Sequence, residues 1–208
     1  MEKEVYLKNP CKASSLPFWK TNQINIPENM KIVLEEKLHS VDVQKYIDER
    51  YFKLIYRMKD IEKPVPDDRY EVKVCAVSEY AKHIAACYGD IGISVRDLET
   101  YQNHATYDRN LWIAVTERGH NSIIASGIAE VDTDIKEGIL EWIQVSPEYR
   151  GKGLGKFVVE ELLWRMKDKA AFVTVSGKVD NPTNPRALYL ACGFAEEEIW
   201  HVMRKNEE

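Results

Sequence analysis

Hydrophobic and polar positions change their spacing several times along the 208-residue chain, and these changes predict an ordered series of strands and helices. Residues 70–77 (YEVKVCAV) alternate in the manner of a half-buried strand. Apolar residues at helical spacing follow, with Ser78 as the expected N-cap and Gly89 as the expected end of that helix. Ser94 is the expected N-cap of a second helix.

The chain after residue 110 reads as strands separated by two further helices. Residues 110–118 and 121–132 predict a β-hairpin with Gly119 in its turn. The remaining strands are expected at 138–145, 171–179 and 196–205, with a helix ending at about Lys169 between the first two and a short helix from Asn184-Pro185 to Gly193 before the last. From residue 70 the order is β-α-α-β-β-β-α-β-α-β, which predicts an α/β domain with a mixed sheet.

The chain before residue 70 carries weaker patterns. Three prolines predict an extended or loop-like conformation for the first 30 residues. A strand is expected over 30–38 and a short helix from Ser40 to about Glu49, while 51–58 is compatible with either element. Residues 62–70 (EKPVPDDRY) break any regular pattern and predict a linker.

The linker predicts two domains: residues 1–67 as an N-terminal extension or small α/β subdomain, and residues 68–208 as the main domain.

The chain is 44% hydrophobic and 30% charged, which is typical of a soluble globular protein. Its net charge of -5 provides no basic field for nucleic acid or an anionic membrane. Residues 1–69 contain 13 Lys and Arg against 12 Asp and Glu, and the rest contains 16 against 22. The acidic part suits a small cationic substrate.

The cysteines are widely separated and form no C-x-x-C pair, which favours free thiols in a reducing compartment. The N-terminal residues lack the apolar segment of a signal peptide, so a cytoplasmic protein is expected. The five histidines show no metal-ligand spacing, and no metal is expected. A homodimer is compatible with the sequence.

The most informative stretch is WIQVSPEYRGKGLGKF at residues 142–157, where a predicted strand, three glycines and a helix N-terminus follow one another. Free N–H groups and the dipole of a helix N-terminus favour an anion, and glycines let a phosphate approach the backbone. A dinucleotide fingerprint begun at Gly151 would require a glycine in place of Lys156, and no register matches a Walker A loop. The alternative is a tight strand–helix connection with no ligand.

Two signatures resemble the GNAT superfamily of acyl-CoA-dependent N-acetyltransferases. Residues 150–155 (RGKGLG) match R/Q-x-x-G-x-G/A, the pyrophosphate-binding motif of that family. Residues 184–194 (NPRALYLACGF) resemble its second signature, with Tyr189 four residues before Gly193-Phe194. The resemblance implies a GNAT fold with a mixed, mostly antiparallel central sheet flanked by helices. It also implies acetyl transfer from acetyl-CoA to a primary amine by direct attack on the thioester.

The resemblance also assigns roles to residues. It implies that backbone groups of the strand hold the pantetheine arm and that the glycine turn holds the pyrophosphate; the implied cofactor-binding residues are Ile143, Gln144, Val145, Arg150, Gly151, Lys152, Gly153, Leu154, Gly155, Lys156, Asn181 and Asn184. The family's usual Asn seven residues before the Tyr is Pro182 here, so Asn181 or Asn184 would take its place. Tyr189 would be the general acid for the CoA sulfur, or else a core aromatic residue.

A carboxylate is needed to deprotonate the amine, and Glu141 is the candidate base. It stands four residues before Val145, so strict alternation would place both side chains on one face. A surface glutamate is the alternative, with Glu130 and Asp132 as fallback bases. Tyr88, Asp90 and Trp112 are candidates either for an acceptor pocket or for ordinary packing. Two other functions remain open: a catalytically silent acyl-CoA sensor and a partner-binding module.

Overall fold

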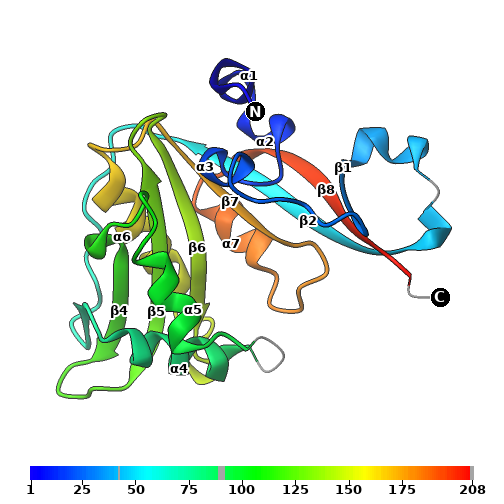
Figure 1. Cartoon of the computed structure of the whole chain (residues 1–208). Helices are drawn as coiled ribbons and strands as arrows, with labels where there is room; N and C mark the ends of the chain where they lie inside the picture. Colours follow the sequence, from blue (N-terminus) through cyan, green and yellow to red (C-terminus); the bar gives the residue numbers. More distant parts are fainter. Residues whose placement is uncertain (42, 89–91, 207–208) are drawn as a thin grey trace. The chain divides into compact units, whose positions relative to one another are not determined.

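The computed structural model describes residues 1–41, 43–88 and 92–206 (Figure 1). It confirms the predicted fold class, an α/β fold with a mostly antiparallel sheet and flanking helices. The chain forms two units, Met1–Arg57 with Thr174–Glu208 (the first unit) and Met58–Val173 (the second unit). None of the helices among the described residues has the length and apolar character needed to cross a membrane.

The second unit contains strands in the order β7-β6-β5-β4-β3, of which β7 starts in this unit and ends in the first. Neighbouring strands from β3 to β6 are antiparallel. Its elements are β3 (Tyr70–Lys73), α4 (Val77–Cys87), α5 (Val95–Tyr101), η3 (Arg109–Leu111), β4 (Trp112–Glu117), β5 (Ile123–Asp132), β6 (Glu137–Val145), η4 (Pro147–Tyr149), α6 (Leu154–Met166) and β7 (Phe172–Lys178).

Helices cover both faces of this sheet (Figure 1). On one face α4 and α5 pack against β4 and β5 through a buried cluster that includes Tyr80, Leu98 and Ile128. On the other face α6 approaches β5 at Gly127, where an added Cβ would lie 2.6 Å from Val158 Cγ1. The missing side chain therefore allows α6 to lie close to the sheet, which fixes the direction in which the chain leaves the glycine turn.

The first unit is built around three antiparallel strands with β8 in the centre. Its strands follow the order β1-β8-β2-β7, and Trp200 of β8 pairs with Leu34 of β1 on one side and Tyr51 of β2 on the other. Its elements are α1 (Lys3–Lys8), α2 (Pro10–Ala13), α3 (Phe18–Thr21), β1 (Met30–Leu34), η1 (Glu35–Ser40), η2 (Val43–Lys45), β2 (Tyr46–Arg57), α7 (Pro185–Ala191) and β8 (Ala195–Lys205).

The N-terminal predictions needed correction. The first 30 residues contain three short helices rather than only extended chain, because Asn9 caps α2 through Lys12 N–H and Pro10 occupies its first turn. The expected strand over 30–38 ends at Leu34. Of the helix expected from Ser40 to Glu49, the described residues show only the 3-10 turn η2 (Val43–Lys45), because β2 starts at Tyr46 and gains its hydrogen bonds from β8.

Predicted boundaries in the second unit were mostly confirmed. Ser94 caps α5 in a reciprocal capping box with Asp97, and Gly119 adopts φ 79° in the turn between β4 and β5. Ser78 is not an N-cap, because α4 already begins at Val77. Gly89, the expected end of that helix, lies outside the described residues. The domain boundary between residues 67 and 68 stays a prediction.

Candidate functional site

The turn between β6 and α6 contains two glycines in a left-handed conformation. Gly151 has φ 75° and Gly153 has φ 81°, values that side chains with a Cβ adopt only with strain. An added Cβ at either position would meet nothing within 4 Å. The backbone at both glycines is therefore bordered by open space, which a ligand can enter.

The start of α6 presents its backbone N–H groups without a side-chain cap. Gly153 is the N-cap residue and has no side chain to accept the first hydrogen bonds. Leu154 is buried and anchors the first turn in the core, while Lys156 is exposed. Since the first N–H groups of a helix have no intrahelical acceptor, those of residues 154–156 are suited to an anion. The turn therefore fits the diphosphate of a nucleotide cofactor.

Arg150, at the start of the turn, is attached to backbone on two sides. Its Nε donates to Val145 O at 3.2 Å and its Nη2 to Cys87 O at 3.4 Å. These bonds link the end of β6 to the end of α4. A guanidinium has five N–H donors, so Arg150 keeps others for an anion.

Two lysines add positive charge around the turn. Lys152 Nζ lies 4.4 Å from the centre of the Tyr149 ring, a cation–π contact. Lys156 Nζ lies 3.6 Å from Glu160 Oε1, one helical turn further along α6. Surface pairs of this kind stabilise a fold by less than about 1 kcal/mol. Both ammonium groups can therefore turn towards an anion at little cost.

A buried histidine connects α4 to the strand that leads into the turn. His83 Nδ1 lies 2.9 Å from Ser126 Oγ and its Nε2 lies 3.0 Å from Ser146 Oγ, with Cys87 Sγ at 3.5 Å. Gln144 donates to Ser126 Oγ. These hydrogen bonds all run in one direction if Ser126 donates to Nδ1 of His83 and the neutral imidazole donates from Nε2 to Ser146. Burial lowers the pKa of His83 to about 4, which keeps the ring neutral near pH 7.

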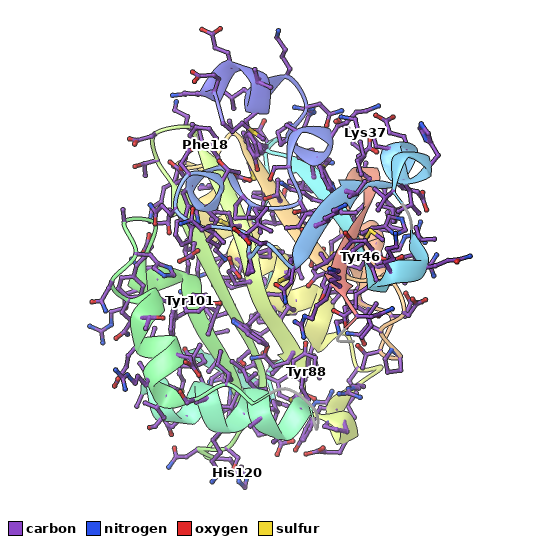
Figure 2. The ribbon with its side chains drawn as sticks, turned by 45° about the vertical axis from the view of Figure 1, so that its right-hand side comes forward. Phe18, Lys37, Tyr46, Tyr88, Tyr101 and His120 are labelled. Carbon is purple, nitrogen blue, oxygen red and sulfur yellow. The ribbon has the colours of Figure 1, made fainter. Side chains whose placement is uncertain are left out.

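Two tyrosines, Tyr88 directly after α4 and Tyr101 at the end of α5 (Figure 2), contact consecutive residues of β6. Tyr88 donates from its hydroxyl to the carbonyl oxygen of Ile143 at 3.1 Å, and Trp142 Nε1 donates to the Tyr101 hydroxyl at 3.4 Å. The strand that carries Ile143 to Val145 is therefore held by the residue that follows α4 and by the last residue of α5. Asp90, the other candidate near Tyr88, lies outside the described residues.

Strand β6 contains a β-bulge at Glu141. Ile128 pairs with Trp142 and the next residue, Ala129, pairs with Leu140, so Glu141 is an extra residue without a partner on β5. A bulge of this kind interrupts the alternation of side chains and changes their direction.

The bulge interrupts the alternation on which the predicted orientation of Glu141 depends. A Cβ at Gly138 would meet Met166 of α6, and Ile143 lies next to Gly127 on the side of α6. These two positions are five residues apart yet face the same helix, which strict alternation forbids. Counting from Gly138 or from Ile143 gives opposite faces for Glu141, so alternation does not assign its face and the shared face with Ile143 stays a prediction.

The fallback carboxylates have other contacts. Glu130 is fully buried, and its Oε1 lies 2.5 Å from His104 Nδ1. Asp132 accepts from the N–H groups of Asp134 and Ile135 in the turn before β6. Both side chains therefore have identifiable structural roles.

The residues of the second signature lie in the first unit. Tyr189 is the buried residue of α7 and packs near Phe52 and Phe194, with ring centres 6.2 and 5.7 Å away. Asn184 caps α7 by accepting from Ala187 N–H. Asn181 accepts from Thr183 N–H and Oγ1, at 2.9 and 2.8 Å. The cap confirms the predicted start of this helix. The surroundings of Tyr189 also fit the alternative role of a core aromatic.

The structure brings together one part of the predicted residue set. Glu141, Ile143–Val145 and Arg150–Lys156 form a continuous strand, turn and helix start within the second unit.

The sequence pattern did not identify His83. Two serines and a glutamine among apolar strand residues were a signal that a polar partner faces them. Within the described residues, no group of three or more His, Cys, Asp or Glu side chains could hold a metal ion.

Comparisons with known proteins agree on one fold. Residues 107–196 match the family model described as Acetyltransferase (GNAT) domain. The chain resembles a GCN5-related N-acetyltransferase from Sphaerobacter thermophilus, with a TM-score of 0.65 and 15% identity over 90% of this chain and 63% of that one. No curated protein sequence gives a significant match.

Two shorter structures are similar as well. The ribosomal-protein-S18-alanine N-acetyltransferase from Escherichia coli has a TM-score of 0.51 and 20% identity, over 67% of this chain and 95% of that one. A chain of the NatC complex bound to Gag peptide and CoA has a TM-score of 0.52 and 16% identity, over 67% of this chain and 99% of that one. Identities this low establish the shared fold. The chain spans less than two thirds of the Sphaerobacter protein.

Proposed function

The chain belongs to the GNAT superfamily through residues 107–196, and on this premise we propose that the protein is an N-acetyltransferase that transfers an acetyl group from acetyl-CoA to a primary amine. The observation that carries the proposal is the turn at the start of α6. It combines two left-handed glycines bordered by open space with helix N–H groups that lack a side-chain cap. This arrangement suits the diphosphate of CoA.

The residues present fit acetyl-CoA as the donor. The backbone N–H groups of 151–156 would bind the diphosphate, and the unused N–H groups of Arg150 would add charge-assisted bonds. Backbone groups of Ile143–Val145 would hold the pantetheine arm, with Asn181 or Asn184 as a further polar contact. When bound, acetyl-CoA supplies the thioester that the amine attacks.

Glu141 would serve as the base. An alkylamine has a pKa near about 10 and must lose a proton before it can attack a carbonyl. A carboxylate can accept that proton directly or through a water molecule. Glu141 is the bulged residue of β6, two positions before Ile143, and bulges are frequent next to active sites.

Tyr189 would protonate the departing CoA sulfur. A phenol is a reasonable donor to a thiolate, since both groups titrate above neutral pH. The resemblance of 184–194 to the second family signature supports this assignment. Backbone N–H groups of β6 could stabilise the negative charge that develops on the carbonyl oxygen.

The acceptor would be a small cationic amine, and the protein cytoplasmic. Residues 70–208 contain 22 acidic against 16 basic side chains, which favours a positively charged substrate. No disulfide joins the four cysteines in the described part of the chain, which fits a reducing compartment.

The experiment is a thiol-release assay with the full chain, acetyl-CoA and a panel of primary amines. Release that depends on both substrates supports the proposal. Binding of acetyl-CoA without release from any amine would favour the silent sensor, and absence of binding would favour the partner-binding module. Tyr189→Phe separates the first two, because an enzyme should keep its affinity for acetyl-CoA and lose turnover.

A further inference from the structure

Strand β2 comes from the N-terminal part of the chain and lies between β7 and β8 in the sheet order. It pairs with β8 in an antiparallel register over most of its length. On its other side, Val179 N–H, directly after β7, donates to Arg50 O at 2.9 Å. The N-terminal segment therefore supplies an interior strand of the first unit, with partners from residues 174–208 on each side.

Two aromatic rings of β2 pack against two rings of the second signature. The ring centre of Phe52 lies 6.2 Å from that of Tyr189, and the ring centre of Tyr56 lies 5.5 Å from that of Phe194. Tyr189 and Phe194 are themselves 5.7 Å apart. All four side chains are buried. Tyr189 therefore has one ring neighbour from its own signature and one from the N-terminal segment.

Phe52 is held in place by β7, which has a glycine beside it. A Cβ added at Gly177 would lie 2.7 Å from Phe52 Cζ and 3.0 Å from Cε1, so the ring occupies the space that a side chain at this position would need. Phe52 is 0% exposed. Its ring thus contacts the backbone of β7 and the ring of Tyr189, and losing it would remove a direct support of Tyr189.

Helix α7 depends on these rings for its position. Among its seven residues, all of which are described, only Tyr189 is buried. The phenol ring is rigid and carries its hydroxyl at the far end, so the packing of the ring decides where the hydroxyl lies. A general acid must come within hydrogen-bond reach of the atom that it protonates, and a displacement of about 1 Å can slow a reaction roughly 100-fold.

We propose that Phe52 is a positioning residue for acetyl transfer, which holds the ring of Tyr189 so that its hydroxyl reaches the departing sulfur. The proton passes from the Tyr189 hydroxyl to the sulfur as the bond between sulfur and the acetyl carbon breaks, and water then returns a proton to the phenolate. This inference rests on the proposed function, and it gives the N-terminal segment a part in catalysis.

The experiment is a double-mutant cycle on the full chain, with thiol release from acetyl-CoA as the readout. Cadaverine, agmatine and lysine amide are the amines, and the one with the fastest release is used throughout. Phe52→Leu should lower kcat about tenfold and change KM for acetyl-CoA by no more than about twofold. Tyr189→Phe should lower kcat roughly 100-fold.

The double variant separates positioning from general damage to the fold. In the Tyr189→Phe background, Phe52→Leu should lower kcat by no more than about twofold, because no hydroxyl is left to position. Damage that does not act through Tyr189 would lower kcat by the same factor in both backgrounds.

Two further variants support the cycle. Phe172→Leu makes the same substitution at a buried residue of the second unit and should change kcat by no more than about twofold. Gly177→Ala disturbs the same contact from β7, because its Cβ displaces the Phe52 ring. It should lower kcat in the unaltered chain and have little further effect in Phe52→Leu, and it replaces Phe52→Leu in the cycle if that variant does not fold. A cooperative urea transition confirms that each variant is folded.

The inference is overturned if Phe52→Leu turns over as fast as Phe172→Leu, or if it slows Tyr189→Phe as much as it slows the unaltered chain. Full turnover by Tyr189→Phe would overturn it as well, while leaving acetyl transfer intact. Failure of the proposed function looks different: the unaltered chain then releases no thiol with any of the amines, and this inference falls with it.

Discussion

His83 Nε2 lies 3.0 Å from Ser146 Oγ, and this contact joins α4 to the first residue after β6. The other ring nitrogen lies 2.9 Å from Ser126 Oγ on β5. One neutral imidazole thus holds two strands and a helix at the entrance to the glycine turn. The geometry of the turn consequently depends on the protonation state of His83.

The first prediction concerns pH. Burial lowers the pKa of folded His83 to about 4 from the ordinary 6.5, so the unfolded chain binds the proton more tightly. The sign follows: the contribution of neutral His83 to stability is fully present above pH 6.5 and is lost as pH falls towards 4. Between these values the free energy of unfolding should fall by up to roughly 1.4 kcal/mol per pH unit because of this group.

Urea unfolding at several pH values measures this effect. His83→Gln should show a shallower fall between pH 6.5 and 4 than the unaltered protein, because glutamine does not titrate. His120→Gln is the control: His120 is exposed next to the β4–β5 turn (Figure 2), and its removal should leave the slope unchanged. Equal slopes for both variants and the unaltered chain would contradict the account of His83.

The second prediction compares two glycines with the same backbone strain. Gly153→Ala and Gly119→Ala each place a Cβ at φ near 80° in open space, so each should lower the free energy of unfolding by about 1 kcal/mol. Only Gly153 lies in the turn before α6. Gly153→Ala should therefore also weaken acetyl-CoA binding roughly tenfold, because its Cβ would occupy the open space through which the diphosphate approaches the backbone. Calorimetry on both variants checks this, and equal affinities would speak against the turn as the diphosphate site.

The third prediction concerns a buried lysine in the first unit. Lys53 of β2 is 1% exposed, and the three N–H donors of its Nζ are shared among four oxygens: the Tyr6 hydroxyl at 3.0 Å and the carbonyl oxygens of Pro10, Ser14 and Leu16 at 3.1, 2.9 and 2.9 Å. Lys53→Met would leave these oxygens without their donor. We expect a loss of about 3 kcal/mol in the free energy of unfolding and faster proteolysis of the N-terminal helices.

A matched lysine on the neighbouring part of the same unit controls for the loss of charge. Lys31 of β1 is exposed, and Lys31→Met should change stability by no more than about 0.5 kcal/mol. If Lys53→Met were equally mild, the N-terminal helices would not depend on this ammonium group.

The fourth prediction concerns the bulged residue of β6. Glu141→Gln should reduce kcat roughly 100-fold or more, because a general base contributes at least that much. The affinity for acetyl-CoA should not change. Glu99→Gln, an exposed glutamate of α5, is the control and should keep full activity. Activity of Glu141→Gln near that of the control would show that another group accepts the proton.

The glycine turn and the short helix of the second signature could be predicted from sequence because local chemistry determines them. Gly151 and Gly153 are required by the left-handed backbone, and Asn184 with Pro185 starts α7. Ser94 likewise caps α5 through its own side chain. In each case the deciding contact lies within a few residues.

Features that depend on partners distant in sequence could not be predicted. The bulge at Glu141 appears only in the register between β5 and β6, and strict alternation along β6 does not anticipate it. The start of β2 at Tyr46 depends on β8, some 150 residues later. The polar contacts of His83 on α4 reach Ser126 on β5 and Ser146 after β6. The spacing of hydrophobic residues within the helix alone does not reveal these partners.

The central claim is that the turn before α6 is a CoA site, and a calorimetric titration of the full chain with acetyl-CoA tests it most directly. NADH and ATP serve as controls, because both carry phosphates but lack the pantetheine arm. The account predicts saturable binding of acetyl-CoA and none of either control. Absence of acetyl-CoA binding, or equal binding of all three, would contradict it.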